Sequence, residues 1–281
     1  MKTIATQTTD GFENTCERDR GFTLTELLVV MATLALLAGL ILPALAKSGD
    51  NSARTVCLNN LRQMGTALNL YAGENQDYLP WPNWGSDSAA PRGWLYAGDP
   101  TTFPITTGKG GPNSVKFWAK YQVVHLMQGV FWQYVLNGKA FLCPNDLKPT
   151  YNPSSLWYQR NCTLSTYVMN GAACFFAAPN SQYNYLTPKI SQIWSPSCII
   201  LFEPDQLIDP GCYNDGAYIP GPDARAGTTA GEGFAPLHTP GVNLLTVSGG
   251  TRVLSSADIT AAQTAPGKGI LWWNPKTVDG R

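Results

Sequence analysis

An uncharged run of 20 residues, from Leu27 to Ala46, constrains this chain more than any other feature of its sequence. As an α-helix rising about 1.5 Å per residue, such a run is about 30 Å long, which matches the hydrocarbon thickness of a bilayer. Residues 1–21 before it are polar and of mixed charge, whereas a secretory signal peptide has a basic start and a shorter apolar region. We therefore predict a single membrane-spanning helix over residues 22–46.

Glu26 places a carboxylate at the fifth position of the apolar stretch that begins at Phe22. An ionised side chain within lipid costs about 3 kcal/mol or more, so an acid at such a position indicates a functional site with a partner. A place at the headgroup boundary is the alternative interpretation of Glu26.

The stretch Arg20-Gly21-Phe22-Thr23-Leu24-Thr25-Glu26-Leu27 resembles the N-terminus of type IV prepilins and type II secretion pseudopilins. The resemblance implies that prepilin peptidase cleaves after Gly21, that Phe22 is then methylated, and that Glu26 guides assembly. Glu26 could pair with the new ammonium group on Phe22 of a neighbouring subunit. Pro43 also agrees with this family, and we expect it to bend the helix.

The same resemblance implies a single-pass protein of the bacterial inner membrane. Its leader, residues 1–21, would be cytoplasmic, and a globular head over residues 76–281 would lie in the periplasm or outside the cell. Charge does not decide the orientation, because three basic residues lie on each side of the predicted span: Lys2, Arg18 and Arg20 before it, and Lys47, Arg54 and Arg62 after it.

An amphipathic continuation of the helix is predicted over residues 47–75. Apolar side chains recur there at intervals of four, three, four and three residues, which places them on one helical face. This stripe consists of Cys57, Leu61, Met64, Leu68 and Tyr71, and the opposite face carries Arg54, Asn60, Arg62 and Asn69. We expect the stripe to pack against a sheet.

The segment Val56–Gly65 resembles a large bacterial subgroup of pilin-like proteins with extended heads. Shorter segments carry the same resemblance: Cys143–Asp146, Tyr167–Gly171, Cys198–Glu203 and His238–Leu245. Ser248-Gly249-Gly250 replaces the Asp-Gly-His turn that is usual in the subgroup, but residues 242–247 and 251–254 still predict a hairpin around this turn. The predicted fold is α+β and pilin-like, with a long N-terminal transmembrane helix packed on a small antiparallel sheet with long irregular loops.

Cleavage after Gly21 would remove Cys16 from the seven cysteines. The remaining six are Cys57, Cys143, Cys162, Cys174, Cys198 and Cys212. Outside the cytoplasm they could form up to three structural disulfides whose pairing the sequence leaves open, and reduced buried thiols are the alternative. Because none lies in a Cys-x-x-Cys motif, neither a redox-active dithiol nor a structural zinc site is expected.

Catalysis is not expected, because no nucleophile motif is present and His125 and His238 are the only imidazoles. Apolar neighbours indicate a core or boundary position for His125, and two nearby prolines indicate a turn for His238. We expect no cofactor, with calcium as an open alternative, since hard oxygen ligands can bind Ca²⁺. The candidate calcium ligands are Glu203, Asp205, Asp209 and Asp215, for which a solvated acidic surface is the commoner explanation.

Four aromatic residues, Trp81, Trp84, Trp94 and Tyr96, either fill a loop-covered core, which we favour, or bind sugars or another chain. Zero formal net charge with 14% charged residues argues against nucleic acid as a partner. The predicted function is that of a structural subunit in a type II secretion pseudopilus or type IV pilus-like fibre. Its partners would be other pilin subunits, prepilin peptidase and the membrane. A membrane-anchored external binding protein that does not polymerise, for example one that binds carbohydrate, is the alternative.

Overall fold

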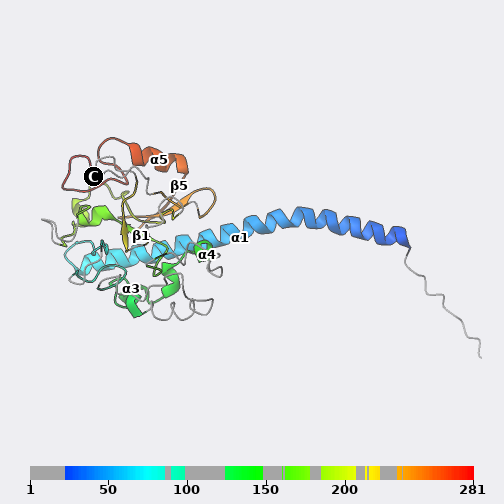
Figure 1. Ribbon diagram of the computed structural model, residues 1–281, viewed down its shortest axis with the longest axis horizontal. Helices are drawn as coiled ribbons and strands as arrows, with labels where there is room; N and C mark the ends of the chain where they lie inside the picture. Colours follow the sequence, from blue (N-terminus) through cyan, green and yellow to red (C-terminus); the bar gives the residue numbers. More distant parts are fainter. Residues whose placement is uncertain are drawn as a thin grey trace, which may run out of the picture. The chain divides into compact units, whose positions relative to one another are not determined.

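The computed structural model describes residues 23–85, 90–98, 124–147, 160, 162–177, 185–206, 213, 215–221, 233–235 and 237–281, without the side chains of 41–48 and 50. The chain divides into two units, Met1–Lys47 and Ser48–Arg281. One helix, α1 (Leu24–Glu74), contributes residues to both units (Figure 1). Phe22, Gly21 and the side chain of Pro43 lie outside the described residues, and Pro43 itself lies within α1.

A capping box starts helix α1. The Thr23 hydroxyl accepts a hydrogen bond from the Glu26 N–H at 3.2 Å, and the Glu26 carboxylate accepts one from the Thr23 N–H at 2.8 Å. These two bonds satisfy backbone donors that have no partner within the helix. Glu26 therefore caps the start of its own helix, a role that the sequence analysis did not predict.

None of the helices, in the part of the chain that the structure describes, combines the length and the apolar character needed to cross a membrane. The predicted membrane-spanning helix over residues 22–46 is therefore not confirmed. Of that stretch, the structure describes the side chains of residues 23–40.

The Ser48–Arg281 unit contains a five-stranded sheet and short helices. The strands are β1 (Val168–Asn170), β2 (Ile199–Phe202), β3 (Ala217–Tyr218), β4 (Val242–Thr246) and β5 (Thr251–Leu254). The further helices are α3 (Trp132–Val135), η2 (Gly138–Phe141), α4 (Pro144–Leu147), η5 (Gly171–Cys174), η6 (Ile190–Gln192) and α5 (Ser256–Thr264).

The sheet has the strand order β3-β1-β2-β4-β5, and it is mixed. The pairs β1–β2, β2–β4 and β4–β5 are antiparallel, which includes the predicted hairpin, but β3 runs parallel to β1. The prediction of a wholly antiparallel sheet was wrong in this respect. The two-residue strand β3 reaches the free edge of β1 from a distant part of the chain, so no hairpin turn forces it to be antiparallel.

Each face of the sheet packs on a separate hydrophobic cluster. Leu61 and Met64 of α1 join Met169, Leu201 and Leu245 in one cluster. On the other face, strand residues pack with Ile259 of α5 and with Leu271 and Trp272 near the C-terminus. Figure 1 accordingly shows the labelled strands β1 and β5 between α1 and α5. The fold is α+β, as predicted.

The predicted apolar stripe of α1 is confirmed over its first four members, Cys57, Leu61, Met64 and Leu68, which are fully buried. Tyr71 is only half-buried. The assignment of Asn60 to the solvent face was wrong, because its side chain is buried and its Nδ2 donates to the Leu142 carbonyl at 3.0 Å. The segment that follows η2 covers this side of the helix.

Helix α1 contacts the β4–β5 turn at two glycines. A Cβ placed on Gly65 would lie 2.5 Å from the Gly249 carbonyl oxygen, closer than real Cβ atoms approach. Gly249 itself has a φ of +83°, which side chains rarely tolerate. The Ser248-Gly249-Gly250 turn thus allows the helix and hairpin backbones to approach closely.

Candidate functional site

Four buried side chains in the Ser48–Arg281 unit bring together two thiols, a carboxylate and an imidazole. They belong to Cys57, Cys143, Glu203 and His238, and one ligand atom from each lies within 4.8 Å of all the others. We refer to these four residues as the Cys–His–Glu cluster. Cys57 belongs to α1, Cys143 immediately precedes α4, Glu203 immediately follows β2, and His238 lies in the loop before β4.

The cluster is connected by short contacts. The Cys57 thiol donates to Glu203 Oε1 at 3.0 Å, and Cys143 Sγ lies 3.1 Å from His238 Nε2. The Tyr167 hydroxyl lies 3.0 Å from Cys57 Sγ. Glu203 Oε2 is buried and has no hydrogen-bond partner. A buried carboxyl oxygen without a partner is costly, so Glu203 brings an unsatisfied polar atom to the cluster.

Strand pairing explains why Tyr167 and Glu203 meet. Val168 of β1 pairs with Phe202 of β2 in antiparallel register, so the residues just outside this pair, Tyr167 and Glu203, are neighbours at the end of the ladder. Cys143 is held by its own backbone N–H, which donates to the Thr166 hydroxyl at 2.9 Å. This end of the sheet therefore positions Tyr167 and Glu203 directly, and it holds the backbone of Cys143 through Thr166.

A buried ion pair supports the segment that carries Cys143. Arg160 donates from Nη1 and Nη2 to the two carboxylate oxygens of Asp146, each at 2.7 Å, and both side chains are buried. The Thr166 hydroxyl donates to the same carboxylate at 2.8 Å. Asn145 adds a bond from Nδ2 to the Leu237 carbonyl at 2.7 Å and lies 3.1 Å from His238 Nδ1. Both chain segments are therefore fixed around the cluster.

Contacts within the cluster and its burial shift the pKa values of its members. The hydrogen bond with Cys57, followed by the contact with His238, lowers the pKa of Cys143 to about 5. The same bond with Cys143, together with burial, raises the pKa of Cys57. Burial, followed by the charge on Cys143, raises the pKa of Glu203 well above its ordinary value. The cluster thus favours one thiolate beside two groups that retain their protons.

A thiolate beside an imidazole is also the arrangement of a cysteine nucleophile. Cys143 has no exposed surface and His238 is only 3% exposed. A substrate could not reach either group, so this geometry fits a structural network or a bound ion better than catalysis. It also shows that His238 contributes more than the local hydrogen bonds of a turn. His125 is half-buried, as expected for a boundary residue, and burial lowers its pKa.

Disulfides were the favoured expectation for the cysteines, but the described cysteines Cys57, Cys143, Cys162, Cys174 and Cys198 are free thiols. All five are buried, and separate environments hold several of them. The Cys174 thiol donates to the Gly171 carbonyl at 3.3 Å, and the Cys198 thiol donates to that of Gly269 at 3.8 Å. No disulfide joins these five in the part of the chain that the structure describes, and Cys212 lies outside it.

The candidate calcium ligands do not gather at one place among the acids that the structure describes, Glu203, Asp205 and Asp215. Glu203 faces the cysteines. Asp215 accepts hydrogen bonds from the N–H groups of Gly85 at 2.6 Å and Ala217 at 2.9 Å, and burial raises its pKa to about 6. Neither is a solvated surface acid. Asp209 lies outside the described residues.

The aromatic residues divide between core and pocket. Trp81, Trp94 and Tyr96 are buried, which confirms the core interpretation for these three, and Trp94 Nε1 donates to the Pro82 and Gly216 carbonyls. Trp84 is half-buried. Trp81 lines a pocket of about 390 Å³, and its ring meets Tyr185 edge-on with centroids 5.2 Å apart.

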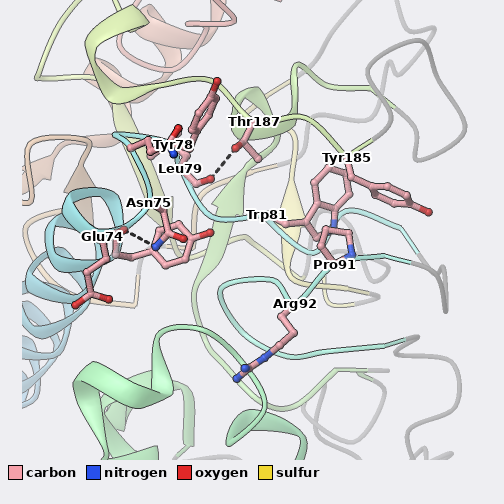
Figure 2. A pocket seen from close by; sticks show the side chains of 11 residues that line it. Glu74, Asn75, Tyr78, Leu79, Trp81, Pro91, Arg92, Tyr185 and Thr187 are labelled. Carbon is pink, nitrogen blue, oxygen red and sulfur yellow. Dashed lines mark hydrogen bonds between the residues drawn. The ribbon is translucent and has the colours of Figure 1, made fainter.

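Rings and polar side chains together line this pocket (Figure 2). The lining residues are Tyr71, Glu74, Asn75, Gln76, Tyr78, Leu79, Trp81, Pro91, Arg92, Tyr185 and Thr187. The buried Nε1 of Trp81 has no hydrogen-bond partner. The pocket is therefore a candidate binding site separate from the Cys–His–Glu cluster.

Sequence reasoning missed the cluster because its members are far apart along the chain. Cys57 and Glu203 are 146 positions apart, and Cys143 and His238 are 95 apart. Metal-site rules that look for closely spaced ligand pairs cannot detect such a set. One available signal was that the five short segments quoted for the subgroup resemblance each contain one of Cys57, Cys143, Tyr167, Glu203 and His238.

Residues 17–42 match the family model described as the prokaryotic N-terminal methylation motif. The chain carries a prepilin-type N-terminus. The motif supports the resemblance to type IV prepilins and pseudopilins. The family of proteins with this motif is structural and not enzymatic. It also suggests a membrane-anchored precursor, processing by prepilin peptidase and assembly with pilin subunits in general terms. No curated protein and no solved structure matches the chain.

Proposed function

We propose that this pilin-like precursor is a structural subunit of a type II secretion pseudopilus or type IV pilus-like fibre. Cleavage after Gly21 and methylation of Phe22 would produce the mature subunit, with its N-terminal helix in the inner membrane and its head in the periplasm or outside the cell. The observation that carries this proposal is the methylation motif over residues 17–42 at the start of a 51-residue helix.

The apolar surface of α1 supports assembly through this helix. Large apolar side chains between Leu24 and Leu40 are exposed on every side of the helix, with Leu28 63% and Leu36 66% exposed. A helix that is apolar all round is stable only when lipid or other chains surround it. We expect the bilayer to cover these side chains before assembly and neighbouring helices to cover them in the fibre.

Processing is tested by intact mass and N-terminal sequencing of protein extracted from membranes. The expected result is a chain that begins at methylated Phe22. A native protein that keeps residues 1–21 would contradict the proposal, because the ammonium group on Phe22 would then not exist.

Glu26 provides the test of the assembly mechanism. Glu26→Gln removes the charge but keeps an oxygen that can accept from Thr23, whereas Thr23→Ala removes the cap and keeps the charge. If Glu26 pairs with the Phe22 ammonium of a neighbour, Glu26→Gln abolishes fibres and Thr23→Ala leaves them intact. The reverse outcome would assign Glu26 to helix capping alone. Electron microscopy of fibres and membrane fractionation of each variant supply the readouts.

The pocket at Trp81 favours a second candidate function, that of an anchored external head that binds carbohydrate. Aromatic rings beside amide and guanidinium groups suit a polar ligand with apolar faces. Glycan binding by the full chain in detergent, weakened by Trp81→Ala but not by Trp194→Ala, would support it. Trp194 is an aromatic control outside the pocket, and since Trp81 is only 4% exposed, native tryptophan fluorescence of Trp81→Ala is required before its loss of binding counts in favour. Absence of fibres in the same cells would favour this function over polymerisation.

A further inference from the structure

We infer that the Cys–His–Glu cluster is a structural site for a divalent transition metal of the zinc class. Two sulfur atoms, one imidazole nitrogen and one carboxylate oxygen converge there, all within 4.8 Å of one another. Thiolate and imidazole ligands select zinc-like ions over calcium and magnesium, which prefer oxygen. The inference does not depend on the proposed function.

The dimensions of the cluster fit one ion. In a tetrahedral zinc site with bonds of about 2.0–2.3 Å, neighbouring ligand atoms are about 3.3–3.8 Å apart. Cys57 Sγ and Glu203 Oε1 are 3.0 Å apart, and Cys143 Sγ and His238 Nε2 are 3.1 Å apart. These two pairs would have to separate by a few tenths of an ångström, and every other pair of ligand atoms already lies within 4.8 Å, so adjustments of about 1 Å or less would bring the four atoms to tetrahedral spacing.

Glu203 supplies an independent observation that points to a ligand. Its side chain has no exposed surface, and Oε2 has no hydrogen-bond partner. A bound cation would compensate this carboxylate and would replace the protons on Cys57 and Glu203, so that one S–H and one O–H bond are exchanged for bonds to the metal and two protons are released, while the Cys143 thiolate binds without losing a proton. The ion would thus compensate three buried acidic groups at once.

Surrounding groups can orient the ligands. Asn145 Nδ2 donates to the Leu237 carbonyl at 2.7 Å and lies 3.1 Å from His238 Nδ1, so this amide holds the backbone beside His238 and faces the imidazole ring. The Tyr167 hydroxyl can donate to Cys57 Sγ from 3.0 Å. All four ligands are buried, which is typical of closed structural sites and not of catalytic sites that keep an open position.

Such an ion would tie helix α1 to the end of the sheet. Cys57 lies on the helix, Glu203 follows β2, and Cys143 and His238 lie in connecting segments. Because the ligands come from distant parts of the chain, the metal would close long loops and stabilise the head as a clip.

The test is titration of the full chain, purified in detergent after reduction and removal of metal, with Co²⁺ and then with Zn²⁺. We expect one equivalent of Co²⁺ to give thiolate charge-transfer absorption and tetrahedral d–d bands, and Zn²⁺ to remove both. Cys143→Ser and His238→Ala should make binding sub-stoichiometric. Cys174→Ser should retain one equivalent, because Cys174 is an equally buried thiol outside the cluster.

Glu203→Gln is a nearly isosteric second variant if the first two fail to fold, and it should weaken Co²⁺ binding while tryptophan fluorescence remains native. A wild-type chain with free thiols that binds no Co²⁺ would overturn the inference without any variant. Protein isolated from cells without metal, and lighter by two hydrogen atoms through a Cys57–Cys143 disulfide, would also overturn it and assign the pair to a cross-link.

Discussion

Residues 24–40 of α1 are apolar on every side and exposed, whereas residues 53–72 of the same helix bury a single stripe against the sheet. Leu34 is 56% exposed in the first region, and Leu61 is fully buried in the second. The hydrophobic effect rewards removal of apolar area from water whatever covers it. The second region therefore contributes to folding of the head, and under the proposed function lipid or another subunit covers the first.

Leucine truncation gives the largest effect that separates these regions. Leu61→Ala should lower the free energy of unfolding of the head by about 2–5 kcal/mol, because it leaves a cavity in the core. Leu34→Ala should leave head stability unchanged and weaken assembly. All nine tryptophans follow residue 80, so denaturant unfolding followed by tryptophan fluorescence reports on the head alone. Equal losses of unfolding free energy in the two variants would contradict this difference between the two regions of α1.

The pH response should also be confined to the head. Burial raises the pKa of Asp215 to about 6 from an ordinary value of 3.8, so its contribution is most favourable below pH 3.8 and declines as pH rises to about 6. At 1.36 kcal/mol per unit this decline is about 3 kcal/mol. The unfolding free energy of the wild type, minus that of Asp215→Asn, should fall by about 2 kcal/mol of this between pH 4 and pH 7. Glu26→Gln should leave the profile of the head unchanged, since Glu26 belongs to the Met1–Lys47 unit and the tryptophans report on the head.

Replacing glycine with alanine should change the stability of the head in opposite directions at two positions in the head-packed part of α1. Gly65→Ala should destabilise the head by about 1–3 kcal/mol, because the new Cβ meets the Gly249 backbone. Gly73→Ala should stabilise it by about 0.5–1 kcal/mol through helix propensity, because nothing lies within 4 Å of the added carbon. Thermal unfolding of both variants checks this, and a stabilising Gly65→Ala would refute the close helix–turn contact.

Two matching helix caps give the smallest test. Ser255 Oγ accepts from the Asp258 N–H at 3.2 Å at the start of α5, as Thr23 Oγ1 does from Glu26 at the start of α1. Ser255→Ala should cost the head about 1 kcal/mol. Thr23→Ala should leave head unfolding unchanged and increase only amide hydrogen exchange in the first turn of α1. A loss of head stability in Thr23→Ala would show that the two regions are energetically coupled.

The helix and the hairpin could be predicted because their signals are local. The spacing of Cys57, Leu61, Met64 and Leu68 reports helical periodicity directly, and the glycine turn at Gly249 marks the hairpin. Asn60 was placed wrongly because its burial depends on a segment more than 80 positions away that covers it. The parallel strand β3 was missed for the same reason, since its partner β1 is distant in sequence.

The sequence by itself determined the methylation motif over residues 17–42, the apolar helix that follows and the stripe that packs on the sheet. An α-helix makes one turn every 3.6 residues and its hydrogen bonds join residues only four positions apart, so one window of sequence is enough to place such side chains on a helical face. Only the tertiary structure decided that Cys57, Cys143, Glu203 and His238 share one buried site. These four residues come together only through the strand register and the packing of the whole sheet against α1. Both depend on contacts between residues far apart in sequence, so the spacing of residues along the chain does not reveal them.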